Sequence, residues 1–104
     1  MINTGDIVPR LDTTKDNELM VAVLSNWTHL HARTGRVVCC PYVPGQIPDD
    51  SLPLVVPVTI PAGTLLPELV QWLPVSALGE PFGNIGPGAL AQASSIVSAL
   101  IGVN

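Results

Sequence analysis

The sequence lacks positive charge over most of its length. Only 12% of the 104 residues are charged, and no Lys, Arg or His follows Arg36. The net charge of −4 argues against broad, nonspecific binding to the phosphate backbone of nucleic acids. A side chain that holds a phosphate therefore has to come from the part of the chain up to Arg36. The acidic remainder offers a surface to a basic, arginine-rich partner.

The sequence also has no long hydrophobic run and few cysteines. Pro, Ser and Gly interrupt the longest apolar candidates, at 52–63 and 94–104, so neither reaches the roughly 20 residues that span a bilayer. The first residues lack the basic start and apolar stretch of a signal peptide. We therefore expect a cytoplasmic protein with reduced thiols and no membrane partner.

Two adjacent cysteines are predicted to be core residues. On a strand, the neighbours Cys39 and Cys40 point to opposite faces, and no second Cys pair or suitably spaced His completes a metal site. We predict neither a metal site nor a cofactor.

The hydrophobic content is high for a short chain. The sequence is 47% hydrophobic, and one domain spanning 1–104 buries only roughly two thirds of its unfolded surface. More apolar residues are present than a single small core can hide. We therefore expect a permanent interface, either in a homodimer or with a standing partner.

Apolar runs separated by turn formers predict strands along the first half of the chain. The runs at 5–10, 19–25 and 35–43 have the composition and length of strands. Prolines recur from Pro41 to Pro87, and proline clashes inside a helix and lacks an N–H donor, so no long helix fits there.

Two further strands are expected within the proline-rich region, at 52–60 and 64–73. Pro57 and Pro67 lie inside these runs, which predicts edge strands or bulges, because proline cannot donate to a strand ladder.

The last segment has a helical pattern. Gly86 and Pro87 suit a helix start, and Gly102 can end the helix. Apolar residues follow at helical spacing on one stripe: Leu90, Ala93, Val97 and Leu100. Short antiparallel strands followed by one C-terminal helix predict a mainly β fold built as a small curled barrel.

Four short motifs occur in an informative order. They are "GDIV" at 5–8, "VAVLSN" at 21–26, "TGRVVCCP" at 34–41 and "PVSALGE" at 74–80. The first two are similar to the opening strands of MazF-type toxins, and the last is similar to the segment before the final helix of CcdB. Nearly end to end, the chain resembles the CcdB/MazF superfamily, toxins of bacterial type II toxin–antitoxin pairs, including actinobacterial toxins of this group. The resemblance implies an SH3-like barrel, a homodimer and a cognate antitoxin.

The resemblance also implies chemistry. MazF-type toxins cleave RNA without a metal, using an Arg before the second strand and a Thr after the third. A cation beside a hydroxyl suits that reaction. The cation stabilises the charge on the phosphorane, while the hydroxyl positions or protonates the reacting group. Here the matching positions hold Leu19 and Val43, so the usual groups are absent. Arg10 and Lys15, at or in the first loop, become the RNA-binding candidates. Other polar residues of that loop are Thr13, Thr14 and Glu18.

CcdB instead inhibits DNA gyrase through an apolar C-terminal tip that ends in Trp-Gly-Ile. The resembling residues here are Ile101, Gly102 and Val103. The Gly and the following aliphatic residue match, whereas Ile101 replaces the aromatic residue. These three residues are candidates for binding a protein target, and packing into a dimer interface is the alternative.

The segment "VLSNWTHLHARTGR" at 23–36 contains both histidines. His29 and His31 can exchange protons near neutral pH, and with Arg33 they form a candidate RNA-cleaving centre, because two imidazoles can act as base and acid. The alternative is a polar surface connection, a loop or short helical turn, with Trp27 folded onto the barrel.

The leading functional hypothesis is a growth-inhibiting toxin of a type II pair, acting as a metal-independent endoribonuclease and neutralised by an antitoxin. The alternatives are a CcdB-like inhibitor of gyrase or another protein, which needs no catalytic groups, and a non-toxic scaffold in a regulatory complex.

Overall fold

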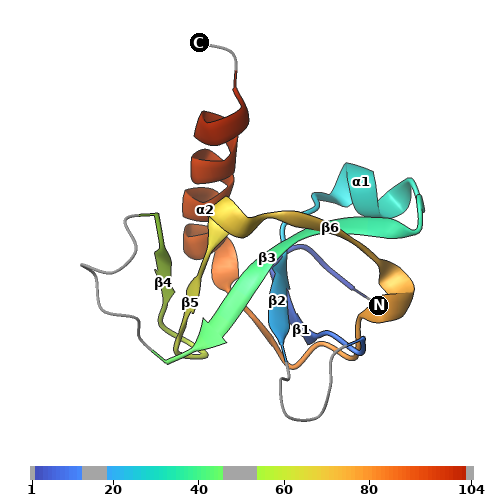
Figure 1. The fold of residues 1–104 in the computed structure, drawn as a ribbon, viewed down its shortest axis with the longest axis horizontal. Helices are drawn as coiled ribbons and strands as arrows, with labels where there is room; N and C mark the ends of the chain where they lie inside the picture. Colours follow the sequence, from blue (N-terminus) through green and yellow to red (C-terminus); the bar gives the residue numbers. More distant parts are fainter. Residues whose placement is uncertain (1, 13–18, 46–53, 103–104) are drawn as a thin grey trace.

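A long central strand organises the fold (Figure 1). The structure, a computed structural model, describes residues 2–12, 19–45 and 54–102. Its elements in chain order are β1 (Asp6–Pro9), β2 (Met20–Val23), α1 (Trp27–His31), β3 (Arg36–Pro44), β4 (Val56–Val58), β5 (Gly63–Leu65), the 3₁₀ helix η2 (Pro67–Leu69), β6 (Gln71–Pro74), the 3₁₀ helix η3 (Val75–Ala77), β7 (Gly83–Asn84) and α2 (Gly86–Ile101). The prediction of strands followed by one C-terminal helix is confirmed.

The strands form one antiparallel sheet in the order β4-β5-β3-β2-β1-β7. One edge of β3 is shared: its last residues pair with β5, and its first residues, Arg36 to Cys39, pair with β6. The prediction of a single strand over 64–73 is therefore wrong. Pro67, which has no N–H to continue a ladder, begins η2 and divides the run into β5 and β6. Pro57 lies in the edge strand β4, as expected.

The chain after β6 closes the curl of the sheet against β1. The Leu11 N–H donates to the Ala77 carbonyl (2.8 Å), and the Gly79 N–H donates to the Pro9 carbonyl (2.9 Å). Further along, β7 pairs with β1. The result is a curled, barrel-like sheet in which β3 contacts both β2 and β6.

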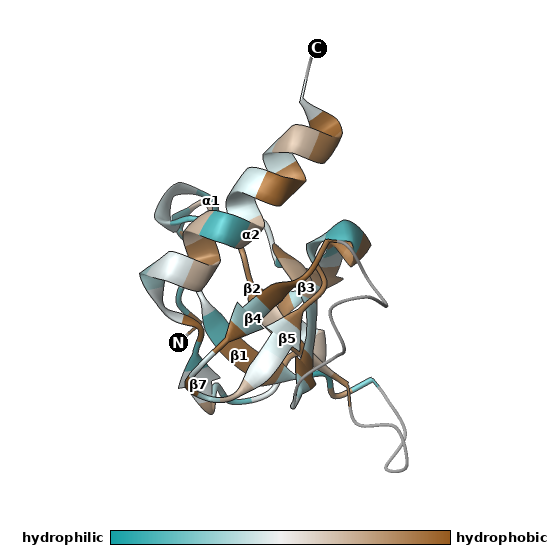
Figure 2. Cartoon of the chain, turned by 90° about the vertical axis from the view of Figure 1, so that its left-hand side faces the viewer, coloured by the Kyte–Doolittle hydropathy of each residue, from teal (hydrophilic) through white to brown (hydrophobic). Residues whose placement is uncertain are grey.

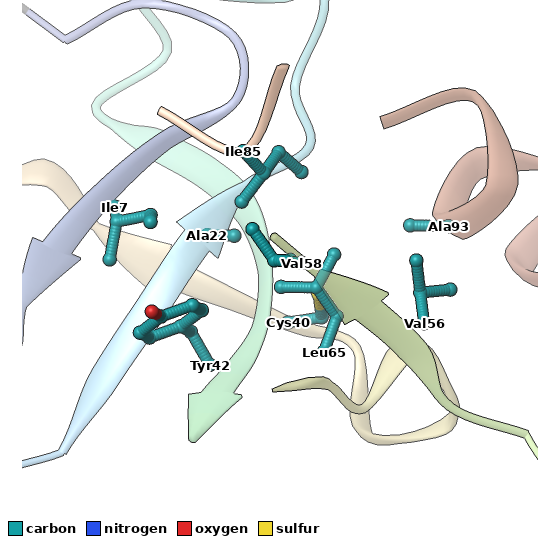
Figure 3. Packing of buried hydrophobic residues seen from close by; sticks show 9 residues of the cluster. All are labelled: Ile7, Ala22, Cys40, Tyr42, Val56, Val58, Leu65, Ile85 and Ala93. Atoms are coloured by element: carbon teal, nitrogen blue, oxygen red, sulfur yellow. The ribbon is translucent and has the colours of Figure 1, made fainter. Parts of the chain in front are cut away.

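Successive side chains along each strand point to opposite faces of the sheet, which creates two cores. Val8, Val21 and Cys39 belong to a cluster inside the curl, together with Leu73 and Leu78. The second cluster lies between the sheet and α2 (Figure 3); its buried members are Ile7, Ala22, Cys40, Tyr42, Val56, Val58, Leu65, Ile85 and Ala93.

The two cysteines divide between these cores. Both are buried and free, one in each cluster, which confirms that they point to opposite faces. Burial raises the pKa of the Cys39 thiol and of the Cys40 thiol to about 12.

Helix α2 packs through its first half and projects beyond the sheet with its second half (Figures 1 and 2). Ala93 is its buried residue, and Leu90 and Ile96 pack against the same core. Leu100, expected on the packed stripe, is exposed together with Ile101, because no other described element reaches that end of the helix. Gly102 follows as the C-cap, as predicted. Within the described ranges, no helix is long and apolar enough to cross a membrane.

Candidate nucleic-acid interface

A short capped helix presents the histidines. The Asn26 side chain accepts a hydrogen bond from the His29 N–H (2.9 Å) and so caps α1, as Asn commonly does at this position. The helix ends after one turn at Ala32, and Arg33 follows with a φ of +51°. Gly35, with a φ of +86°, completes the turn into β3. The expectation of a loop or short helical turn here is confirmed.

His29 is held by a buried hydroxyl. The Ser25 Oγ lies 2.7 Å from the His29 Nδ1 and accepts a hydrogen bond from the Val38 N–H (2.7 Å). Because that N–H occupies a lone pair of the hydroxyl oxygen, the hydroxyl hydrogen is free to point at Nδ1. The Thr34 hydroxyl, 3.4 Å from the His29 Nε2, donates to the Arg36 carbonyl (3.2 Å). With the Ser25 hydroxyl as the donor to Nδ1, the neutral ring carries its proton on Nε2, directed toward Thr34.

His31 lies on the other side of α1. Residues two apart on a helix do not face each other, and His31 stacks on Trp27 with ring centroids 3.9 Å apart. Trp27 is 70% exposed, so the expectation that it folds onto the barrel is wrong: its ring packs on its own helix. The two imidazoles consequently line different hollows.

Three hollows surround α1. The largest, which we call the α1–β3 cavity, has a volume of about 390 Å³ and is lined by residues that include His29, Leu30, Arg33, Arg36, Val37 and Val75. The Trp27 hollow, of about 270 Å³, is lined by Trp27, His31 and Arg33 among others. The Trp72 hollow, of about 310 Å³, lies between α1, β6 and α2 and is lined by Trp72, His29 and Val97 among others. Arg33 therefore borders the α1–β3 cavity and the Trp27 hollow, and His29 borders the α1–β3 cavity and the Trp72 hollow.

Uncompensated positive charge gathers at the α1–β3 cavity. Arg33 and Arg36 both line it, and its lining contains no carboxylate. Across residues 2–12, 19–45 and 54–102, the ion pair found is that of Arg10 with Asp12, so neither cavity arginine is paired with a described acidic residue. On a chain of net charge −4, this is where an anion is attracted.

Exposed aromatic rings flank the same helix. Trp72 is 61% exposed on the outer side of β6, while its neighbour Leu73 is buried inside the curl. The Trp72 and His29 rings meet edge to face at 5.5 Å. Trp27 lies on the other flank. Such rings can stack on the bases of single-stranded nucleic acid.

Sequence reasoning missed Trp72, Arg36 and Ser25 as parts of this surface. The alternation of side chains along β6 would have placed Trp72 and Leu73 on opposite faces of the sheet. It could not have placed either residue next to α1. That neighbourhood arises from the pairing of β6 with the first half of β3.

Arg10 is engaged elsewhere. Its guanidinium donates to the Asp12 carboxylate at 3.0 and 2.8 Å and to the Gln71 Oε1 at 3.4 Å. The hydrogen bonds from Arg10 lower the pKa of the Asp12 carboxyl group. Arg10 does not line any of the three hollows. Lys15 lies outside the described residues, as do Thr13, Thr14 and Glu18.

The two positions that carry Arg and Thr in MazF-type toxins lie at the same end of β2 and β3. Met20 pairs with Tyr42, which places Leu19 beside Val43. Both side chains are aliphatic, so the tertiary structure supplies no cation or hydroxyl from these two positions.

The C-terminal candidates lie at the projecting end of α2. Ile101 is 75% exposed and Gly102 is exposed as well, whereas Val103 lies outside the described residues. Of the side chains that the structure describes, no group of three or more His, Cys, Asp or Glu is placed to hold a metal ion.

Solved structures identify the fold as that of MazF-type toxins. An endoribonuclease in complex with its cognate antitoxin from Mycobacterial species matches with a TM-score of 0.78 and 14% identity, over 100% of this chain and 98% of that one. MazE–MazF from Deinococcus radiodurans matches with a TM-score of 0.79 and 18% identity, over 99% of this chain and 98% of that one. At these identities the likeness is one of fold, and it confirms the predicted barrel.

Sequence comparison is more specific. The family model described as type II toxin-antitoxin system toxin Rv0299 matches residues 5–100. Toxin Rv0299 of Mycobacterium tuberculosis (strain ATCC 25618 / H37Rv) is 58% identical over 101 residues, which cover 97% of this chain and 99% of that protein. The chain belongs to this family, and it is a toxin of a type II toxin–antitoxin system, as predicted.

Proposed function

We propose that this toxin arrests growth by cleaving RNA, with the surface around α1 as its substrate site. The observation that carries the proposal is the α1–β3 cavity, where two arginines without described acidic partners share the lining with His29. The helix α1 that carries His29 is flanked by two exposed tryptophans. Arginine forks match phosphate oxygens, and tryptophans stack on unpaired bases. An endoribonuclease is among the solved structures that share this fold, which supports the same activity here.

His29 is the residue we assign to proton transfer. Ser25 holds its Nδ1, so Nε2 is the ring atom left to meet a substrate. In this assignment the 2′-oxygen of the substrate attacks the phosphorus and its proton passes to water, while the bond from phosphorus to the 5′-oxygen breaks. The imidazolium form of His29 gives its Nε2 proton to that leaving 5′-oxygen, and Arg33 at the same cavity stabilises the charge on the phosphorane. His31 lines a different hollow and supports binding of the neighbouring backbone rather than the same step.

Two partners belong to the proposal. A cognate antitoxin neutralises the toxin, and the uncharged, exposed face of α2 supports a homodimer. The target RNA places the action in the cytoplasm. Light scattering of the purified chain tests the dimer, and the expected mass is twice 10.9 kDa.

The decisive experiment is mapping of RNA 5′ ends, with growth curves, after induction without antitoxin. The wild type is expected to arrest growth and to create new ends at one recurring sequence. Arg33→Ala with Arg36→Ala should abolish both effects, while Arg33→Lys with Arg36→Lys, which keeps the charge, should retain part of them. Glu68→Gln, an exposed remote change, is the matched control. Arrest without new ends would contradict the proposal.

A gyrase-type or other protein target is the second candidate. It is favoured by the exposed, uncharged end of α2 with Ile101 at its tip. Removal of residues 101–104 should then abolish arrest while the double Ala variant keeps it. The reverse pattern would exclude this candidate.

A further inference from the structure

The α1–β3 cavity is divided between an apolar wall and a cationic rim. Leu30, Val37 and Val75 form part of the wall, and Arg33 and Arg36 belong to the lining that carries charge. A volume of about 390 Å³ lies within the range of roughly 300–1,000 Å³ that is usual for small-molecule pockets. An apolar wall beside two guanidiniums suits a ligand with a flat ring at one end and an anion at the other.

The backbone of the turn adds further donors. Thr34 and Gly35 line the cavity and are exposed, and within the described residues their N–H groups form no hydrogen bond. The Val75 N–H donates to the Gly35 carbonyl (2.9 Å), which holds η3 against the turn. The lining therefore includes two backbone N–H groups beside the two arginines, and such donors can contact phosphate oxygens or a base edge.

We propose that the α1–β3 cavity is a nucleotide pocket. It takes the base of one unpaired nucleotide against Leu30 and Val75, and the phosphate of that nucleotide against Arg33 and Arg36. This inference rests on the proposed action on RNA and deepens it: the captured nucleotide sets the position of cleavage, because His29 borders the same cavity.

The pocket can be tested without cleavage. The probes are the four nucleoside 5′-monophosphates and inorganic phosphate, titrated into the full chain by calorimetry and by NMR of the Thr34 and Gly35 amides. We expect one monophosphate to bind at least about tenfold more tightly than inorganic phosphate, which is about 1.4 kcal/mol. Equal affinity for all five probes would overturn the proposal, because it would indicate a bare anion site.

A variant that fills the cavity distinguishes binding of the base from binding of the phosphate. Val75 is exposed, so Val75→Trp can add a ring to the cavity while both arginines remain. It should remove the preference for the nucleotide and leave phosphate binding unchanged. The matched control is Leu69→Trp, at an exposed residue of η2, which should bind as the wild type does. Unchanged nucleotide binding by Val75→Trp, in a variant that melts as the wild type does, would overturn the proposal.

Cleavage assays distinguish failure of this inference from failure of the proposed function. If the wild type binds a monophosphate selectively but cuts no RNA, the pocket stands and the endoribonuclease proposal falls. If Val75→Trp still cuts RNA at the wild-type sequence, the endoribonuclease stands and the pocket falls.

Discussion

Arg33 occupies a backbone conformation that an arginine tolerates poorly. Its φ of +51° follows directly on the Ala32 C-cap of α1, a position where glycine is usual. The left-handed conformation costs an L-residue roughly 1–2 kcal/mol, and glycine loses about 0.5–1 kcal/mol through its greater freedom in the unfolded chain. Arg33→Gly should therefore have a free energy of unfolding about 0.5–1 kcal/mol higher than that of Arg33→Ala.

The comparison of these two variants isolates the backbone, because both lack the guanidinium and residue 33 is exposed. We expect the Gly variant to melt about 2–8 °C above the Ala variant, as follows for a domain of this size. Both should lose RNA binding to the same extent. Thermal and urea unfolding measure the first difference, and titration with a fluorescent oligonucleotide measures the second.

Arg36 offers a matched control. It begins β3, and glycine in a strand costs about 0.5–1 kcal/mol relative to alanine. Arg36→Gly should therefore be less stable than Arg36→Ala, the opposite sign to position 33. If Arg33→Gly were no more stable than Arg33→Ala, the strain assigned to this turn would be refuted, and with it the view that the arginine is kept there for binding at the cost of stability.

Three further predictions concern the buried groups and the histidines. The thiols of Cys39 and Cys40 have an ordinary pKa of 9.0, and burial raises it to about 12. Their contribution to the free energy of unfolding is therefore complete below pH 9 and is lost as the pH rises toward 12. Urea unfolding of the Cys39→Ala, Cys40→Ala variant should show a smaller decline of this free energy at alkaline pH than the wild type shows. An equal decline would contradict this. Ser25→Ala removes the acceptor of the Val38 N–H and should lower the free energy of unfolding by about 1–3 kcal/mol. The ¹⁵N shifts of His29 in this variant should show mixed tautomers. An unchanged Nε2–H tautomer would show that Ser25 does not orient the ring. His29→Ala should abolish RNA cleavage while His31→Ala weakens only binding, and equal losses of cleavage rate at saturating RNA would refute their separate roles.

Much of the fold follows from local pattern. The strands over 5–10, 19–25 and 35–43 and the helix from Gly86 to its C-cap at Gly102 were predictable, because apolar runs and helical spacing are properties of neighbouring residues. The division of 64–73 at Pro67 was not, since proline permits either an edge strand or a turn, and the pairing partners decide between them.

For the candidate site too, some features follow from the sequence and others only from the tertiary structure. The sequence by itself determined that every Lys and Arg precedes residue 37, that His29, His31 and Arg33 are neighbours, and that the usual MazF side chains are absent at Leu19 and Val43. Only the tertiary structure decided that the two histidines line different hollows and that Trp72 joins His29. Helix geometry turns residues two apart away from each other, and strand pairing across β3 brings Trp72 to α1 from far along the chain.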